Sequence, residues 1–194
     1  MKADDVALIV LAAGRSERFG TEDKLLADLH GQPLGLHTPQ RLAPMKWATK
    51  IAVTLGELAG PLQDLGFVIV APLQDGGLGD NIAKAVSALN RPQSVLICLA
   101  DMPFVTLTHI EEMMAAMSAD RSIVASQGAG VLSPPVLFGV KYFESLLVLS
   151  GDIGARDVIV ANKPELALVP ATRTTLMDVD TLALLAEARL LTNA

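Results

Sequence analysis

The sequence has few cysteines and few aromatic residues, and it carries no concentrated positive charge. Its single cysteine, Cys98, excludes an internal disulfide framework or cysteine zinc cluster, and its apolar neighbours predict a buried, inert thiol. Aromatic residues make up 4%, so base-stacking platforms are not expected. The net charge of -6, without any basic block, argues against a nucleic-acid partner.

Long hydrophobic runs are missing as well. No apolar stretch approaches the length of a membrane span, and the N-terminal residues do not follow the pattern of a secretory signal. We therefore expect a cytoplasmic protein with no membrane partner. With 194 residues, of which 51% are hydrophobic, the chain is long enough to bury a core, and we expect one domain over residues 1–194.

Short apolar runs alternate with helical patterns through the first half of the chain. The runs are rich in Val, Ile, Leu and Ala, and they predict buried strands at 6–12, 50–55, 67–71 and 94–100. Helices are expected near 33–43, 57–65, 80–90 and 107–117, the last capped by Thr106 or Thr108. This alternation predicts an α/β fold, with a mostly parallel central sheet and helices on both faces.

The second half has a different rhythm, which predicts a mixed part of the sheet. Strand-like runs lie at 122–126, 134–140 and 165–172. A helix is expected over 141–149, and another within 151–161 with Asp152 as its cap. The run at 176–191 predicts a final helix that begins near Asp180 or Thr181.

A glycine-bearing loop with three cations follows the first predicted strand. Residues 10–24 read VLAAGRSERFGTEDK, and the spacing of Gly14 and Gly20 fits neither the dinucleotide fingerprint nor the Walker phosphate loop. Small residues at a strand end still let a ligand approach the backbone, and Arg15, Arg18 and Lys24 are suited to phosphate oxygens. This stretch alone leaves two interpretations equally open, a phosphate site or a solvated charged loop.

A single acid ends the strand predicted at 94–100. Asp101 would face the same edge of the sheet as the first loop, where ligands bind in open α/β folds. Mg²⁺ prefers oxygen ligands and usually takes one or two carboxylates together with substrate phosphates. A turn or helix-cap acid is the alternative for Asp101 alone, but the two segments together favour a metal–nucleotide site.

Four segments in order resemble the MobA-like nucleotidyltransferases, and most closely their molybdenum cofactor cytidylyltransferase branch. They are LAAGRSERFG followed by Lys24, LADMPFVT, LSGDIGARDVI and MDVDT. The resemblance implies a Rossmann-like nucleotidyltransferase fold. It also implies Mg²⁺-dependent transfer of CMP from CTP to the phosphate of molybdopterin, with release of pyrophosphate. The pair Ala12-Ala13 is similar to the cytidylyl branch, which favours CTP.

The resemblance also assigns roles to residues. Catalysis is expected of Arg18, Lys24 and Asp101, with Mg²⁺ on Asp101 and Asp180 as a second candidate metal ligand. Negative charge grows on the departing pyrophosphate, so the cationic side chains and the metal should contribute most to stabilising the transition state. Nucleotide contacts are expected of Leu11, Ala12, Ala13, Gly14, Arg15, Gly20 and Asn81.

The acceptor side carries the largest departure from the family pattern. Ser133-Pro134-Pro135 stands where members commonly have Gly-His-Pro, so another phosphorylated acceptor remains open. Ser133, Arg156 and Asp180 are the acceptor-side candidates, although Arg156 equally suits a structural ion pair and Asp180 a helix cap. Asp80 replaces a serine near a helix start, and we expect it to cap its own helix.

Other interpretations remain. The chain could use GTP or another NTP, or it could be a non-catalytic nucleotide- or pterin-binding relative that acts through a molybdoenzyme or maturation partner. A phosphate monoester is already an anion near neutral pH, so no general base is required. His30, His37 and His109 are accordingly expected at surface or helix-end positions.

Overall fold

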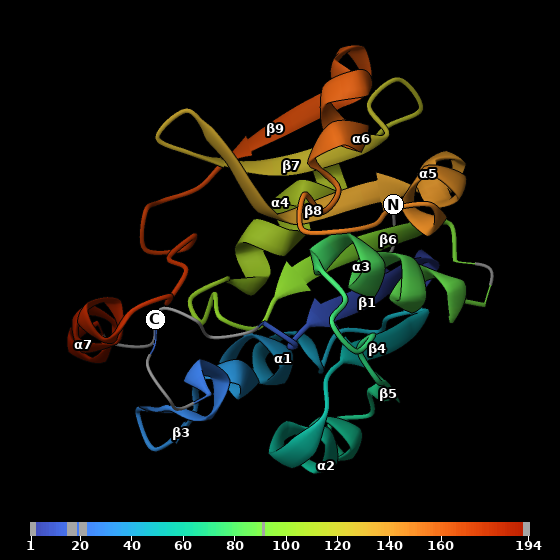
Figure 1. The fold of residues 1–194 in the computed structure, drawn as a ribbon. Coiled ribbons are helices and arrows are strands. Elements are labelled where there is room, and N and C mark those ends of the chain that lie inside the picture. The colour runs from blue at the N-terminus through green and yellow to red at the C-terminus, as the bar shows by residue number, and fades with distance from the viewer. Residues whose placement is uncertain (1–2, 15–18, 20–22, 91, 192–194) are drawn as a thin grey trace.

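A seven-stranded sheet forms the centre of the computed structural model, which describes residues 3–14, 19, 23–90 and 92–191 (Figure 1). The strand order is β5-β4-β1-β6-β8-β7-β9. The first four of these strands run parallel, β8 runs antiparallel to β6 and β7, and β9 is parallel to β7. The predicted mostly parallel sheet with a mixed second half is confirmed. The strands are β1 Val6–Leu11, β4 Thr49–Val53, β5 Val68–Val70, β6 Ser94–Leu99, β7 Ile123–Gly128, β8 Val131–Gly139 and β9 Leu166–Pro170.

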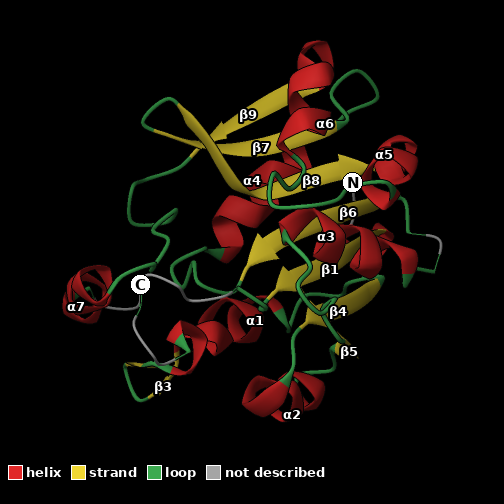
Figure 2. Ribbon diagram, in the orientation of Figure 1, coloured by secondary structure: helices red, strands yellow, loops and turns green. Residues whose placement is uncertain are grey.

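Helices cover both faces of this sheet, as Figure 2 shows with α3, α5 and α6 on the side nearer the viewer. One face packs against α1, α2 and α4 through residues such as Leu42, Leu62 and Ile110. The other face packs against α3, α5 and α6 through Ile82 and Val158 among others. The helices are α1 His37–Leu42, α2 Ala59–Asp64, α3 Leu78–Ser87, α4 Leu107–Ala116, α5 Phe143–Leu147, α6 Arg156–Ala161 and α7 Leu182–Leu190.

The alternation of side chains along the central strands explains the two-sided core. In β1, the residues Val6, Leu8 and Val10 face the α1–α2–α4 side, while Ala7 and Ile9 face the α3–α5–α6 side. All six residues of β1 are buried, as a parallel strand covered on both faces requires. Cys98 lies in this core, which confirms its predicted burial, and the loss of hydration raises the pKa of its thiol.

A third apolar cluster lies apart from the sheet, at the edge where β1 and β6 end. It joins α7 to a small hairpin, β2 Asp28–Leu29 and β3 Gln32–Pro33, and it includes the buried Phe19. The guanidinium of Arg189 donates to the backbone carbonyl of Asp28 at 2.7 and 3.1 Å and ties the final helix to this hairpin. The cluster therefore anchors the C-terminal helix next to the strand ends.

Several local predictions differ from the structure. Asp152 does not cap α6, because the chain turns through 151–155 and that helix begins only at Arg156. Thr106 caps α4 by accepting from the amide of His109, and Thr181, rather than Asp180, caps α7 by accepting from the amide of Leu184. Among the described residues, no helix has both the length and the apolar character needed to span a bilayer.

Candidate active site

The strand ends bring the start of the first loop, Ala12 to Gly14, and Asp101 to one edge of the sheet. The amide of Ala12 donates to the carbonyl of Val53 at 2.9 Å, and the amide of Ala100 donates to the carbonyl of Leu11 at 3.0 Å. Hydrogen bonding between β1, β4 and β6 thus continues just past the ends of the strands. Ala12 is buried, whereas Ala13 is half-buried and Gly14 is exposed, so a ligand can reach the backbone there.

Lys24 is placed by a short 3-10 helix, Lys24–Leu26, that follows the first loop. The carboxylate of Asp23 caps this helix by accepting from the amide of Leu25 at 2.9 Å. A Cβ atom on Gly14 would lie 3.8 Å from the Cε of Lys24, so the lysine stem passes beside the exposed end of the loop. Lys24 is buried, and its ammonium points toward carboxylates.

The turn after β6 holds Asp101 firmly because helix α1 binds its backbone. The hydroxyl of Thr38 donates to the carbonyl of Met102 at 2.6 Å. The guanidinium of Arg41 donates to the carbonyls of Pro103 at 2.7 Å and Val105 at 3.0 Å. These bonds fix the segment that carries Asp101 without using its side chain.

Two further carboxylates reach the same place from the segment before α7. The amide of Val179 donates to the backbone carbonyl of Asp101 at 3.0 Å, and the Val179 side chain is fully buried in the third cluster. Asp178 and Asp180 flank this anchor. Asp180 was a sequence-based candidate, whereas Asp178 was missed. The signal available was the spacing of the two acids, with one buried apolar residue between them.

Lys24 and the three acids form a compact charged cluster. The Lys24 Nζ lies 2.5 Å from Asp101 Oδ2 and also contacts Asp180 Oδ1. Burial alone would lower the pKa of Lys24, but the carboxylates of Asp101 and Asp180 raise it above its ordinary value. Loss of hydration and the negative charges of Asp101 and Asp180 raise the pKa of Asp178 to about 7, although part of that residue is exposed.

This cluster fits a divalent cation with a preference for oxygen ligands. Asp101, Asp178 and Asp180 each offer an oxygen atom, and these atoms lie within 4.8 Å of one another. The buried Oδ1 of Asp101 has no hydrogen-bond partner among the described residues, so it remains available to a ligand. Carboxylates in such a set are suited to Mg²⁺ or Mn²⁺, which would neutralise phosphate charge when bound there.

Two acceptor-side candidates come together elsewhere. Ser133 and Arg156 both line a pocket of about 560 Å³ that also touches Leu11 and Leu99, the last residues of β1 and β6. The register between β7 and β8 shifts next to Ser133, where the two prolines 134–135 interrupt the pairing, as expected of residues that lack an amide hydrogen. Arg156 makes no ion pair with any described residue, so the structural alternative for it finds no support in the described part of the chain.

Asp80 closes the start of α3, as predicted, and it also holds a second segment. Its Oδ2 accepts from the amide of Gly77 at 2.8 Å and from the amide of Gly151 at 2.9 Å. These two bonds lower the pKa of the Asp80 carboxyl. The amide of Gly79 donates back to the carbonyl of Gly151 at 2.7 Å, which completes the attachment of 150–152 to α3.

The remaining nucleotide-site candidates are only partly described. Asn81 is buried, and its side-chain carbonyl accepts from the amide of Leu73 at 3.3 Å, so it stabilises the loop before α3; a contact with a base stays a prediction. Arg15, Arg18 and Gly20 lie outside the described residues.

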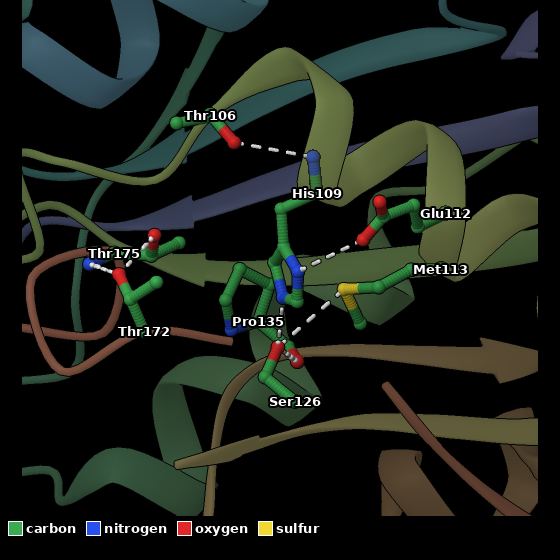
Figure 3. Close-up of polar contacts among 8 residues, drawn as sticks. All are labelled: Thr106, His109, Glu112, Met113, Ser126, Pro135, Thr172 and Thr175. Atoms are coloured by element: carbon green, nitrogen blue, oxygen red, sulfur yellow. Dashed lines mark hydrogen bonds and ion pairs between the residues drawn. The ribbon is translucent and has the colours of Figure 1, made fainter. Parts of the chain in front are cut away.

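Two of the histidines lie at helix ends and are buried. His37 and His109 stand at the starts of α1 and α4, which agrees with the helix-end alternative of the prediction, and both are buried. Figure 3 shows His109 directed at Ser126: its Nε2 lies 2.8 Å from the Ser126 hydroxyl, which donates to the carbonyl of Pro135 at 2.9 Å. Ser126 is fully buried, so this chain of bonds supports the β8 irregularity and does not form a nucleophile.

The described geometry defines a class of protein. An α/β sheet of this order, with a small-residue loop, a buried lysine and a carboxylate cluster at one strand edge, is the framework of a nucleotidyltransferase. The model of the MobA-like NTP transferase domain matches residues 8–166. The chain belongs to this family, and it is an enzyme of the nucleotidyltransferase type.

Individual relatives agree with this assignment. The chain is 25% identical over 141 residues to a molybdenum cofactor guanylyltransferase of Shewanella sp. strain W3-18-1, covering 72% of this chain and 70% of that protein. Its fold is similar to Rv0371c from Mycobacterium tuberculosis, with a TM-score of 0.81, 21% identity, and 96% and 99% of the two chains covered. A second structure of Rv0371c, in complex with manganese, has a TM-score of 0.74, 19% identity and 96% and 98% coverage.

Proposed function

We propose that the chain transfers a nucleotidyl group from an NTP to the phosphate of molybdopterin, with CTP as the donor. An oxygen of the acceptor phosphate attacks the α-phosphorus and forms the new P–O bond. The bond from the α-phosphorus to the bridging oxygen of the β-phosphate breaks, and pyrophosphate leaves with the electron pair. No proton has to move, because the acceptor phosphate is ionised near neutral pH.

The observation that carries this proposal is the position of Lys24 beside Asp101 at the carboxyl ends of β1 and β6. Lys24 would hold the triphosphate as charge builds on the departing pyrophosphate. Asp101, with Asp180 beside it, would hold a divalent cation that neutralises phosphate charge when bound. The backbone at Ala12, Ala13 and Gly14 would approach the base and ribose side of the nucleotide, with Leu11 at the strand end behind it.

GTP is the second candidate donor because relatives with 25% identity are named guanylyltransferases. The pair Ala12-Ala13 favours CTP, since the guanylyl branch tends to carry glycine at the second of these positions. A substitution of Ala13 by glycine therefore tests the assignment directly. If the loop selects the base, Ala13→Gly shifts the ratio of kcat/KM toward GTP, and an unchanged ratio would remove the basis for choosing CTP from this pair.

The first experiment measures pyrophosphate release with molybdopterin, Mg²⁺ and either CTP or GTP. Asp101→Asn keeps the side-chain volume but removes the charge, and it should lower kcat/KM on the order of a hundredfold or more. Asp120→Asn, in an exposed turn, is the matched control and should behave as the parent protein. Release that is unchanged in Asp101→Asn would contradict the proposed role, and nucleotide binding without release by either nucleotide would favour a non-catalytic relative.

A further inference from the structure

One continuous stretch of chain, residues 23–42, begins at the charged cluster and ends in helix α1. It opens with the 3-10 helix Lys24–Leu26, passes through the β2–β3 hairpin, and continues through a second 3-10 helix, Leu34–Leu36, into α1. The amide of Leu34 donates to the carbonyl of Ala27 at 2.9 Å, so the chain that leaves the first short helix returns to the start of the second. The two short helices therefore lie side by side.

Gly35 allows the two short helices to pack this closely. A Cβ atom at Gly35 would lie 3.1 Å from the Cβ of Leu25, the residue that follows Lys24, so a larger residue would push the helices apart. The Nε2 of His37 lies 2.8 Å from the carbonyl oxygen of Leu29, which can only accept, and this bond fastens the first turn of α1 to the hairpin. Lys24 and α1 are therefore parts of one packed segment, the 23–42 unit.

The 23–42 unit reaches the turn after β6 through two side chains of α1. The hydroxyl of Thr38 donates to the carbonyl of Met102 at 2.6 Å; the amide of Val105 also donates to this carbonyl, but at 3.5 Å, so Thr38 makes its short bond. Thr38 is fully buried, so water cannot easily replace its hydroxyl. One guanidinium nitrogen of Arg41 donates to the carbonyls of both Pro103 and Val105.

The surroundings of Arg41 indicate what its charge is used for. The side chain is half-buried, and it pairs with no carboxylate in the described part of the chain. Burial lowers the pKa of its guanidinium, because a cation removed from water loses hydration. Hydrogen bonds to backbone carbonyls offset that cost. The guanidinium therefore stabilises the backbone that directly follows Asp101.

The Asp101 carboxylate has few bonds of its own that could orient it. Its Oδ2 meets the Lys24 Nζ at 2.5 Å, whereas its buried Oδ1 has no hydrogen-bond partner among the described residues. The attraction between two charges weakens with distance, and a misplacement of about 1 Å at a reacting centre can lower a rate about a hundredfold. The position of this carboxylate therefore depends on the backbone of 101–105, which α1 holds.

We propose that Thr38 and Arg41 are positioning residues, which hold Asp101 at the distance from Lys24 that the transfer reaction requires. Because Lys24 and α1 belong to the same 23–42 unit, one segment both carries the lysine and fixes the aspartate that faces it. Thr38 and Arg41 act through the backbone of the turn and not on a substrate. This assignment rests on the proposed transfer reaction.

The first test measures the coupling between Lys24 and Asp101 without turnover. Urea unfolding of the parent protein, Lys24→Met, Asp101→Asn and the double variant gives this coupling as a factor in the unfolding equilibrium constant. The cycle is then repeated with Thr38→Val, which keeps the shape of the side chain but lacks the hydroxyl, and with Thr38→Ser, which keeps the hydroxyl. The coupling factor should fall about tenfold with Thr38→Val and stay near the parent value with Thr38→Ser.

Ser94→Ala is the matched control, because it removes a buried hydroxyl at the other end of β6. A substitution that only destabilises the fold leaves the coupling factor unchanged, as we expect of this control. An equal coupling factor in the parent, Thr38→Val and Ser94→Ala overturns the proposal, and so does a parent protein without coupling between Lys24 and Asp101.

Arg41→Met provides the same test if Thr38→Val does not fold. It should also lower the coupling factor, because the carbonyls after Asp101 lose their donor. Its control is Arg121→Met, which removes a bond to the carbonyl of Leu166 at the opposite edge of the sheet. A coupling factor that Arg41→Met leaves at the parent value overturns the role of Arg41.

The second test measures kcat and the KM for CTP in the pyrophosphate assay. Thr38→Val should lower kcat about tenfold or more with little change in this KM, Thr38→Ser should keep most of the activity, and Ser94→Ala should keep the parent kcat. A parent-like kcat in Thr38→Val contradicts a role in the reaction. If the parent protein releases no pyrophosphate with CTP or GTP, the proposed transfer fails, and the coupling factor still decides whether Thr38 positions Asp101.

Discussion

The Lys24 ammonium contacts two of the three carboxylates that could hold a metal ion, and replacing it tests whether ammonium and free metal compete there. In Lys24→Met the stem is kept but the ammonium is lost, so three carboxylates with oxygen atoms within 4.8 Å face one another without that cation. We expect two opposite effects. Turnover falls, whereas free Mn²⁺ binds more tightly than it does to the parent protein when no nucleotide is present.

The size of the effect follows from the geometry. Two unit charges 2.5 Å apart attract by about 7 kcal/mol at an effective dielectric constant of about 20. Much of this attraction offsets the lost hydration of the ammonium, so breaking such a buried pair costs about 3 to 5 kcal/mol. Mn²⁺ at a hundred times its Kd would return about 2.7 kcal/mol of stability to the variant.

Calorimetric titration with Mn²⁺ and thermal unfolding at several Mn²⁺ concentrations measure both quantities. The Mn²⁺ Kd should fall about tenfold or more in Lys24→Met, and the unfolding temperature of the variant should rise more steeply with Mn²⁺ than that of the parent. Lys46→Met, an exposed substitution, is the control. A folded Lys24→Met protein that binds Mn²⁺ no more tightly than the parent would refute the competition between ammonium and metal.

Two further predictions concern the supports of the site. A Cβ on Gly77 would lie 2.3 Å from the backbone of Gly151. Gly77→Ala should therefore lower the free energy of unfolding in urea by about 1 to 3 kcal/mol and raise the acceptor KM. Gly60→Ala is the control, because a Cβ at Gly60 meets open space, and it should do neither. Burial lowers the pKa of His109, so the unfolded chain binds a proton that the folded chain does not. Stability is therefore full above about pH 6.5 and falls below it by up to about 1.4 kcal/mol per pH unit. His109→Leu should flatten this slope and cost about 1 to 3 kcal/mol at pH 7.5, because the buried Ser126 hydroxyl loses its bond with His109 and keeps only its other contacts. A slope that is equally steep in His109→Leu would show that other groups cause it.

The central sheet could be predicted because its strands leave a one-dimensional signal. Runs such as 6–12 and 94–100 are continuous and apolar, as burial on both faces requires, and they match β1 and β6 to within one residue. The direction of β8 leaves no such signal, because an apolar run has the same pattern whether its strand pairs parallel or antiparallel. Only its pairing with β6 and β7 reveals that it is antiparallel.

The site was predictable in part for a similar reason. Lys24 and Asp101 follow strand ends, and a parallel sheet brings such residues together. Asp178 reaches them only because the amide of Val179 binds the carbonyl of Asp101, a long-range contact that local pattern does not encode. The pocket was missed because Ile153 and Val160 look like core residues in the sequence, although the structure leaves both exposed.

The third apolar cluster has a consequence for how the enzyme loses activity. Asp178 and Asp180 are carried by a segment whose anchor, Val179, packs with α7 and the small hairpin and not with the sheet. Small clusters at the margin of a fold open at a lower free energy than the central core. On heating, α7 should detach while the sheet is still intact, so the carboxylates would leave Lys24 and Asp101, and inactivation would precede global unfolding.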